Sequence, residues 1–456
     1  MTVKEIYSSF IISALIISSG IGTAFSLENQ PRKLLIDKLL SLPIKTNGVT
    51  IDGVEVIQLS ELEKILNSNS IELEIMRSQI KQKKYILQSK VAAWYPNFSL
   101  SSSGFPQYLN GSVENNLSTS TSSDQWKTNI SATIKWDIIN PSRIPEIDEA
   151  RDQLADARLA YLIKFRDTYL EALNNFFMLQ RSNEYVRIAE ESIETSQTSL
   201  KEAEIRLDSG IGTKFEVLEA KAQLAKDKQF LIKKVGEKKI NQRSLAQILN
   251  LEGKLNPVIN SKPEIIGTWQ KSLAKSIIAA YSFREELEKA KVKISINSNQ
   301  TKLSLAANRP TFSLFNTLSL SSAKGEAGVA SPDDRNEIYS ESNTIGIKFD
   351  WSIFNGGSVK ANYNSKKEKG KELTASLLLK KSQIRKEVEE SFYNLEIAEQ
   401  NITNTLHEVE SAKESLRLAL LRLKAGITTQ REVVTNQRDL TQAEVNYVEA
   451  ITDYNL

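Results

Sequence analysis

Two segments of the chain alternate between apolar and polar residues. The apolar members are Ile130, Ala132, Ile134, Trp136 and Ile138 in residues 129–138, and Ile345, Ile347, Phe349, Trp351 and Ile353 in residues 344–353. Successive side chains of a β-strand point to opposite faces, so each segment predicts a strand with one wholly apolar face. A strand of this length and pattern suits the wall of a barrel with lipid outside and water inside.

Weaker alternation marks a partner strand ahead of each strong one. We expect strands at 96–102, 129–139, 311–320 and 344–354. The Ser-, Gly- and Asn-rich stretches at 103–125 and 321–342 predict loops between the partners. Four strands cannot close a barrel, and an open edge in a bilayer would leave backbone groups unpaired. The pattern therefore predicts that several copies of the chain close one sheet together.

Helical periodicity fills the chain between these strands. Polar helical runs cover 59–93 and 269–307 and end before Pro96 and Pro310, and longer runs cover 145–251 and 358–456 with interruptions near Gly210 and Gly426. Proline cannot continue a helix, which explains the first two ends. At about 1.5 Å per residue, a helix from Pro145 to Gly210 would be roughly 100 Å long. Such helices must pack side by side, and a coiled-coil spacing runs through Leu406, Val409, Leu416, Leu420, Leu423 and Ile427.

The same order of patterns occurs twice, which indicates an internal duplication. The segment AAWYPNFSL at 92–100 matches AANRPTFSL at 306–314, WDIIN at 136–140 matches WSIFN at 351–355, and RLDSGIGT at 206–213 matches RLKAGITT at 422–429. We therefore expect a first repeat at 59–251 with its helical tip near 210, a linker at 252–268, and a second repeat at 269–456 with its tip near 426.

The first residues have the pattern of a secretory signal peptide. Lys4 precedes a mainly apolar run at 10–21, and the small-x-small pattern Ala24-Phe25-Ser26 follows. The run is too short to span a membrane. We expect a signal peptide at 1–26 and an N-terminal periplasmic segment at 27–58; an N-terminal anchor helix is the alternative.

Composition narrows the function mainly by exclusion. The 456 residues include 59 basic and 56 acidic ones, scattered in alternation, so no basic stripe suggests a nucleic-acid partner. The absence of Cys excludes disulfides and thiolate metal sites. We find no catalytic constellation and expect no enzyme, cofactor or metal. His407 is the single histidine and has no obvious partner ligands.

The duplicated order of helix, proline, strand, loop, strand and long helical hairpin, together with the R-L-x-x-G-I-x-T pieces, resembles the TolC family of outer-membrane efflux and secretion ducts. The likeness covers about 59–456. It implies an α+β membrane protein: a homotrimer whose protomers each give four strands to a twelve-stranded β-barrel, continuous with a long periplasmic α-helical barrel. The implied function is a passive exit duct of a tripartite efflux pump or a type I secretion system. The implied partners are a periplasmic adaptor protein and an inner-membrane transporter.

The resemblance also implies positions for a gate and for adaptor contacts. The helical tips at Gly210, Ile211, Gly212, Gly426, Ile427 and Thr428 match the family's adaptor contacts. Glu432 matches an acidic ring that narrows the tunnel at its periplasmic end, whereas the family's second acidic position falls on Thr435. This departure puts in doubt how tightly the gate shuts. Glu216 and Glu219 occupy the corresponding stretch of the first repeat.

The strands add candidates of their own. Lys135 with Asp137 and Lys348 with Asp350 would form ion pairs facing the barrel lumen, or else be ordinary solvated charges. Trp136 and Trp351 suit a membrane-interface aromatic belt, or else a plain strand core.

Two other function classes remain open from the sequence. A periplasmic adaptor would carry one helical hairpin, flanked by Gly-rich β segments, rather than two. A structural coiled-coil surface protein would lack paired strands with lipid-compatible faces in both repeats. The transported substrate, whether drug, metal or protein, cannot be read from the sequence.

Overall fold

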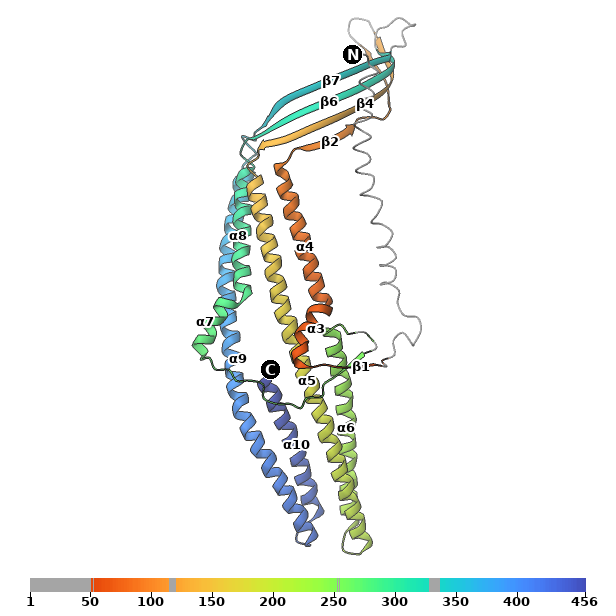
Figure 1. Ribbon diagram of the computed structural model, residues 1–456, viewed down its shortest axis with the longest axis vertical. Coiled ribbons are helices and arrows are strands. Elements are labelled where there is room, and N and C mark those ends of the chain that lie inside the picture. The colour runs from red at the N-terminus through yellow and green to blue at the C-terminus, as the bar shows by residue number, and fades with distance from the viewer. Residues whose placement is uncertain (1–50, 52, 115–119, 252, 254, 328–336) are drawn as a thin grey trace.

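The protein is an elongated molecule with a β-sheet at one end and two helical hairpins at the other (Figure 1). The computed structural model describes residues 51–456 except 52, 115–119, 252, 254 and 328–336. The expected signal peptide at 1–26 lies outside the described residues. So do residues 27–50 of the expected N-terminal segment at 27–58. Within the described part of the chain, no helix is both long and apolar enough to cross a membrane.

The sheet is antiparallel and is built by both halves of the chain. Its strands are β2 (Asn97–Ser102), β3 (Gln107–Glu114), β4 (Ser120–Ile139), β6 (Thr311–Ala327) and β7 (Glu337–Asp350). They lie in the order β2-β4-β6-β7, and β3 also pairs with β4. Because β2 pairs with residues 130–135 of β4 and β3 with residues 120–127, these two strands occupy one edge of the sheet in succession.

The strands are longer than the sequence predicts. The expected loop at 103–125 contains β3 and the start of β4, and the expected loop at 321–342 contains the end of β6 and the start of β7. These stretches are mainly polar and carry no apolar alternation, yet the β6–β7 register continues unbroken from Thr311↔Asp350 to Lys324↔Glu337. At its other end β7 stops at Asp350, short of the expected boundary at 354.

Among the described residues, eight α-helices form the shaft and its side elements. They are α3 (Leu62–Asn69), α4 (Ile71–Val91), α5 (Arg143–Asp208), α6 (Lys214–Ile248), α7 (Leu273–Phe283), α8 (Glu285–Ala306), α9 (Ser358–Lys424) and α10 (Gln430–Asn455). The 66 residues of α5 reach about 100 Å at 1.5 Å per residue. Helices α5 and α6 form one hairpin, and α9 and α10 form the other (Figure 1).

Each expected helix ahead of the sheet is broken in two. Ser70 separates α3 from α4 with extended backbone, and its side chain accepts a hydrogen bond from the Leu73 N–H as an N-cap. Arg284 separates α7 from α8, again with extended backbone. The expected linker at 252–268 is also not featureless, because it contains β5 (Leu255–Val258), which pairs in parallel with β1 (Gly53–Val56).

The main apolar core lies at the middle of the shaft, where these extra elements pack on α5. Leu62, Leu66 and Leu73 are buried against Phe176 and Leu245. A smaller cluster joins Leu416, Ala419 and Leu423 of α9 to Val433 of α10. Of the expected coiled-coil seam, Leu406 and Ile427 are exposed, so the seam is only partly formed within one chain.

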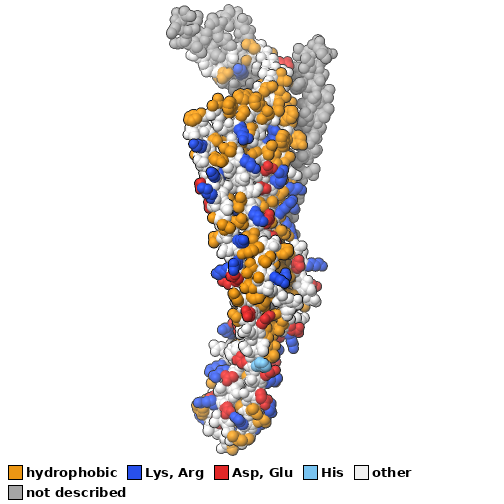
Figure 2. Space-filling view, turned by 90° about the vertical axis from the view of Figure 1, so that its left-hand side faces the viewer, with side chains coloured by type: hydrophobic (Ala, Val, Ile, Leu, Met, Phe, Trp, Pro, Cys, Tyr) orange, Lys and Arg blue, Asp and Glu red, His pale blue; other side chains and the backbone are white. Residues whose placement is uncertain are grey.

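Much apolar surface stays uncovered. Figure 2 shows hydrophobic side chains spread over the side of the molecule that carries α7 and α9. Leu378 and Leu379 of α9 are 63% and 72% exposed, and Phe283 of α7 is 78% exposed. An isolated copy of this chain therefore leaves large apolar residues in water on its helices as well as on its sheet.

Candidate functional site

The strand register gathers the apolar side chains on one face of the sheet. Trp136, Leu314 and Ile347 lie opposite one another across β4, β6 and β7, and Phe312 lies opposite Phe349. Ile345 and Ile347 are 73% and 70% exposed on this face. Exposed isoleucines on β4 and β7, with leucines on β6 between them, are out of place in water and suit a lipid contact.

The opposite face of the sheet is a ladder of hydroxyl groups. Ser99, Thr133, Thr317 and Thr344 lie in one row across the four strands. The hydroxyls of Thr133 and Thr317 are hydrogen-bonded at 3.1 Å. One face is therefore mainly polar, although Phe315 lies opposite Lys135, and the other is mainly apolar, although Asn316 and Asn343 are hydrogen-bonded on it.

The four charged residues singled out from the sequence lie on the polar face and form two pairs. The Lys135 Nζ lies 3.1 Å from a carboxylate oxygen of Asp137, and the Lys348 Nζ lies 2.9 Å from one of Asp350. Ser313 of the strand between them donates a further hydrogen bond to Asp137 at 2.8 Å. The pairs are at least partly exposed, so they add little stability and mainly set the charge of this face.

Trp136 and Trp351 do more than cover the sheet. The Trp136 indole N–H donates to the carbonyl of Trp94 at 3.0 Å, and the Trp351 indole N–H donates to the carbonyl of Asn308 at 3.1 Å. Trp94 and Asn308 are matching positions of the two repeated segments. Trp136 thus links the end of β4 to the segment after α4, and Trp351 links the segment after β7 to the segment after α8. Sequence reasoning missed this bond, although both partners stand in the repeated pieces.

The first helical tip is a tight turn. The N–H groups of Ile211 and Gly212 both donate to the Arg206 carbonyl, at 3.0 and 2.9 Å. Gly210 has φ +75°, and a Cβ on Gly212 would lie 2.9 Å from backbone atoms of Arg206 and Leu207. Glycine at both positions is therefore required by this turn. Thr213 and Glu216 then form a capping box that starts α6.

The second tip turns similarly at Gly426, but it has Thr428 where the first tip has Gly212, and it uses its acidic residue differently. Gly426 has φ +73°, and the Ile427 N–H donates to the Arg422 carbonyl at 2.9 Å. Glu432 stands where Glu216 stands in the first tip. Instead of capping its helix, its carboxylate accepts a hydrogen bond from the Thr428 hydroxyl and lies 3.5 Å from the Arg422 guanidinium. Thr435, one turn on, is half-buried.

Several polar contacts join the two tips. The Arg431 guanidinium lies 3.0 Å from a carboxylate oxygen of Glu219, and Arg206 donates to the Leu423 carbonyl at 3.3 Å. Ile211 and Ile427, at the extreme end of the molecule, are 69% and 76% exposed. The tips thus present two apolar side chains outward above a polar connection, a combination that suits a protein partner.

Behind the tips, the hairpins meet along a buried polar seam. Ser192, Ser196 and Ser199 of α5 are buried, as are Gln430 and Gln437 of α10. The Gln437 side chain donates to the Ser192 carbonyl at 3.0 Å, and the Gln430 side chain donates to the Ser199 hydroxyl. Sequence reasoning missed this seam. The spacing of the serines was a signal, but their partners are more than 200 residues away.

Asp227 of α6 lies in the same seam. It is 6% exposed and accepts a hydrogen bond from Gln223 at 2.9 Å, while its other oxygen has no partner among the described residues. Burial is the largest influence and raises the pKa of Asp227, although the polar side chains of Ser196, Gln223 and Ser192 beside it oppose this effect.

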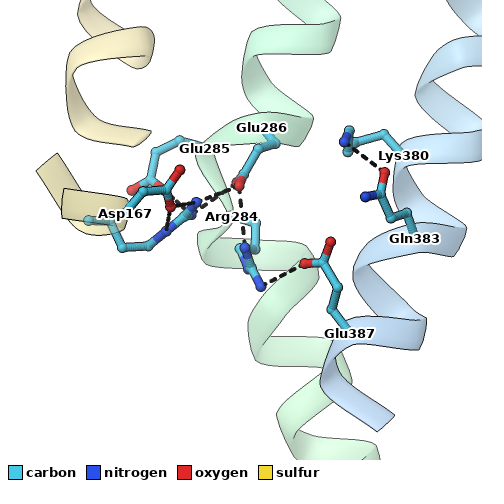
Figure 3. Close-up of polar contacts among 8 residues, drawn as sticks. Asp167, Arg284, Glu285, Glu286, Lys380, Gln383 and Glu387 are labelled. Atoms are coloured by element: carbon cyan, nitrogen blue, oxygen red, sulfur yellow. Dashed lines mark hydrogen bonds and ion pairs between the residues drawn. The ribbon is translucent and has the colours of Figure 1, made fainter. Parts of the chain in front are cut away.

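An ion-pair network connects three helices at the middle of the shaft (Figure 3). Arg166 of α5 bonds to Glu286 at 2.5 Å and to Glu285 at 3.3 Å, both in the first turn of α8. Arg284 bridges Glu286 to Glu387 of α9, at 3.3 and 3.1 Å. Despite partial burial, the Arg166 hydrogen bond helps lower the pKa of Glu286 to about 2. This network sits at the break between α7 and α8.

Next to the network is an open groove of about 1190 Å³ between α7, α9 and the end of α10. Trp269, Phe283, Phe392 and Tyr454 line it together with the charged residues of the network. The Tyr454 hydroxyl donates to the Gly267 carbonyl at 2.9 Å, which ties the end of α10 to the linker.

His407 has one neighbour of note. Its Nδ1 lies 3.4 Å from Glu410, and both side chains are exposed. Among residues 51–456, leaving aside those not described, no group of three or more His, Cys, Asp or Glu side chains could hold a metal ion.

Comparison with known proteins relates this arrangement to a family and to solved structures. The model of a family described as outer membrane efflux protein matches residues 64–251 and 279–455. No curated protein sequence matches the chain. Among solved structures, the chain is similar to CusC, described in connection with transmembrane channel formation, with TM-score 0.71 and 15% identity over 91% of this chain and 94% of that one.

Two further solved structures show the same likeness. The outer membrane protein VceC of Vibrio cholerae has TM-score 0.71 and 16% identity over 87% of this chain and 93% of its own. The CmeC outer membrane channel of Campylobacter jejuni has TM-score 0.70 and 14% identity over 87% of this chain and 83% of its own. At such identities the likeness shows a shared fold.

Proposed function

Because the chain belongs to the outer membrane efflux protein family, we propose that it forms the passive exit duct of a tripartite efflux pump or of a type I secretion system. Membership of this family confirms the resemblance to TolC-type ducts found in the sequence. The duct lies in the outer membrane, and its helical part extends into the periplasm. It performs no chemistry and needs no cofactor.

The two-faced sheet carries this proposal. It has a lipid-compatible face, a hydroxyl-lined face, and two edges, β2 with β3 on one side and β7 on the other, that pair with no further strand among the described residues. Following the chain through the antiparallel sheet, β7 runs opposite to β2 and β3, so three copies can join edge to edge into a closed antiparallel barrel of twelve strand positions. Closure leaves no backbone edge in the bilayer. The polar face, with Lys135, Asp137, Lys348 and Asp350, then lines the lumen.

An internal duplication accounts for the shared order of elements in the two halves. Helix, strand, strand and long hairpin follow one another as α4 to α6 and again as α8 to α10. The matching bonds of Trp136 and Trp351 to the helix ends support the same origin. The proposal therefore includes two structural repeats, at 59–251 and 269–456. It also includes removal of residues 1–26 as a signal peptide and a position of Trp136 and Trp351 at the membrane interface.

The tips are the proposed gate and adaptor contact. Gly210, Ile211, Gly212, Gly426, Ile427 and Thr428 form the end of the shaft that meets a periplasmic adaptor attached to an inner-membrane transporter. Glu432 of three protomers narrows the tunnel there, with Thr435 above it. Arg422 pairs with Glu432 within each protomer, so the ring combines three carboxylates with three guanidinium groups.

Fractionation and mass measurement test the proposal. We expect the mature chain, starting near Leu27, to co-purify with the outer membrane and to have three times the protomer mass in detergent. A soluble monomer would contradict both the location and the trimer. The family assignment favours the duct over a periplasmic adaptor or a surface coiled coil, and co-purification of an inner-membrane transporter would indicate which class of substrate the duct carries.

A further inference from the structure

Uncompensated basic side chains gather where the helices meet the sheet. Lys84 precedes the end of α4, Lys302 and Arg309 flank the end of α8, and Lys360 and Lys367 lie in the first turns of α9. All five are exposed. Figure 2 shows Lys and Arg predominating on the upper part of the helical shaft, whereas Lys, Arg, Asp and Glu mix farther down. We call these five residues the basic collar.

The carboxylates of this zone are already engaged elsewhere. Glu146 pairs with Lys90 at 2.8 Å, and Asp148 pairs with Arg151 at 2.5 Å. Asp152 accepts hydrogen bonds from the neutral side chains of Ser295 and Asn299, so it keeps its charge but points toward α8. In the part of the chain that the structure describes, none of the collar residues forms an ion pair. The collar therefore carries five positive charges per protomer that no ion pair among the described residues neutralises, whereas most carboxylates of this zone are paired with other basic side chains.

The collar forms a narrow band. Arg309 precedes β6 by two residues, and Lys360 is the third residue of α9. Lys84, Lys302 and Lys367 lie within ten residues of the helix end nearest the sheet, or about 15 Å at 1.5 Å per residue. Electrostatic attraction in physiological salt acts over about 8 Å. The upper members of this band are thus within reach of any charged surface at the level of the junction.

Exposed apolar side chains border the collar on its sheet side. Trp94 and Tyr95 follow α4 and are 47% and 71% exposed, and Ile353 and Phe354 precede α9 and are 73% and 84% exposed. At both junctions the order along the molecule is apolar first and basic second. Aromatic side chains favour the headgroup level of a bilayer, and basic side chains just outside it attract anionic lipids.

We propose that the basic collar binds the phosphate-bearing headgroups of anionic phospholipids in the periplasmic leaflet of the outer membrane. The proposal rests on the proposed function, because only a sheet inserted in the membrane brings the collar to this leaflet. Charge complementarity and the adjacent apolar ring favour a lipid surface over a soluble polyanion, which would gain nothing from Phe354 or Tyr95. Each basic side chain near the surface increases anionic-lipid affinity about five-fold.

Lipid co-purification tests the collar. The full chain is reconstituted into vesicles of equal phosphatidylglycerol and phosphatidylcholine with identical acyl chains, re-extracted as a trimer, and its retained lipids are quantified. We expect wild type to retain phosphatidylglycerol at about two to five times the amount of phosphatidylcholine. The variant K84Q/K302Q/R309Q/K360Q/K367Q should bring this ratio close to one, whereas Arg in place of the four lysines should preserve it.

The control removes as many charges elsewhere. Lys214, Lys221, Lys226, Lys228 and Lys239 on α6 are partly to fully exposed and form no ion pair among the described residues, and K214Q/K221Q/K226Q/K228Q/K239Q should keep the wild-type ratio. An equal loss in both variants would overturn the collar in favour of overall charge. If the glutamine variant does not assemble, the pair K360Q/K367Q alone should lower the ratio measurably, and an unchanged ratio there overturns the proposal.

Other outcomes separate the proposals. A wild-type trimer that inserts but retains both lipids equally overturns the collar and leaves the duct intact. Collar-dependent retention on isolated cell-wall polymer, with no lipid preference, would assign the surface to that polymer and overturn the lipid proposal. A chain that does not insert into these vesicles overturns the proposed function and the collar together.

Discussion

At the scale of single residues, Asp227 shows how burial and nearby polar groups oppose each other in the seam behind the tips. A carboxylate that is 6% exposed and has one oxygen without a partner among the described residues disfavours its own charged form. Its pKa is raised by burial, so the folded protein binds a proton that the unfolded chain has already lost. The contribution of Asp227 to stability is therefore greatest at low pH. It declines as pH rises from its ordinary value near 3.8 to its raised folded-state value.

We predict that Asp227→Asn strengthens the seam at neutral pH. Removing the buried charge should stabilise local structure by about 1 kcal/mol, or roughly five-fold in amide-exchange protection of α6. Wild type should gain protection on acidification, and the variant should gain less. Hydrogen exchange of peptides around Asp227 measures both. Equal protection of the two proteins at neutral pH would mean that the neighbouring hydroxyls already balance the charge.

A second residue-scale prediction concerns the gate. Because Glu432 faces Arg422 at 3.5 Å, Glu432→Gln should leave three uncompensated guanidinium groups around the tunnel of the proposed trimer. We expect the ratio of cation to anion permeability to fall about two- to five-fold, and the effect to shrink at 1 M salt, where screening acts over about 3 Å. Planar-bilayer recordings in asymmetric salt measure this ratio.

Glu216→Gln is the matched control for that measurement. Glu216 holds the equivalent position in the first tip but bonds to the backbone of Thr213, and Gln can keep this capping bond. The control should change selectivity less than Glu432→Gln. If both variants behave as wild type, Glu432 belongs to a solvated helix face, and its assignment to the gate is wrong.

At the scale of elements, the ion-pair network holds the start of α8 against α5 and α9. The lowered pKa of Glu286, about 2, means that its pairing stabilises the fold above the ordinary value near 4.5 and is lost only as pH falls toward 2. Arg166→Gln should therefore cost about 1–3 kcal/mol at neutral pH, because it leaves two glutamates without their shared partner. Arg151→Gln, which breaks an exposed pair with Asp148, should cost less than about 0.5 kcal/mol. Thermal unfolding in detergent at pH 7 compares the two.

The faces of the sheet give the next element-scale prediction. Ile345→Lys puts a charge on the apolar face of β7, at a cost of about 2–4 kcal/mol near the bilayer midplane, three times per trimer. Thr344→Lys puts the same charge on the polar face one residue away. We expect the first variant to be lost from the outer membrane and the second to assemble. Heat-resistant trimers in membrane fractions are the readout, and equal yields would show that the faces are assigned wrongly.

The elements show which parts of the fold the sequence could supply. The strand faces were predictable because a period of two decides the side of every residue at once. The strand ends were not predictable, because mainly polar stretches continue the ladder of hydrogen bonds without apolar alternation. The helix breaks were not predictable either. The break at Ser70 depends on one N-cap hydrogen bond, and the break at Arg284 adjoins an ion-pair network with α5 and α9.

The candidate site divides in the same way. The tips could be predicted from Gly210 and Gly426, because glycine readily adopts the left-handed backbone of such turns. The structure brings the two tips together at one end of the molecule. Other parts of the site depend on contacts that only the fold creates. These are the pairing of Glu432 with Arg422, the hydrogen bond from Gln437 to Ser192, and the grouping of the collar residues. In the sequence the charges alternate evenly, whereas the fold collects a basic excess beside the sheet.

At the scale of the whole molecule, one chain is an incomplete object. In the part of the chain that the structure describes, the sheet has two unpaired edges, and the shaft exposes Leu378 and Leu379 on α9 together with Ile232 and Ile240 on α6. Burial of apolar area is worth about 25 cal/mol per Å², so large exposed residues on several helices strongly favour association. A closed ring of protomers would cover the shaft and the sheet edges in a single arrangement, which suits the proposed trimer.

The last prediction tests that closure directly. The chain contains no Cys, so introduced thiols have a clean background. If β7 of one protomer pairs with the β2–β3 edge of the next, one of the four double variants that combine Ser99→Cys or Ser101→Cys with Ser342→Cys or Thr344→Cys should bring two sulfurs within disulfide reach, with Cα atoms about 4.4–6.8 Å apart. Each single-cysteine variant should stay uncrosslinked. Mild oxidation of the correct pair should yield dimers and then a closed covalent trimer on non-reducing gels, because every protomer carries both halves of the bond. Using four combinations allows for the unknown register between protomers. If all four remain monomeric in membranes, while the same protein is correctly folded, β7 does not meet this edge, and the twelve-stranded barrel must be abandoned.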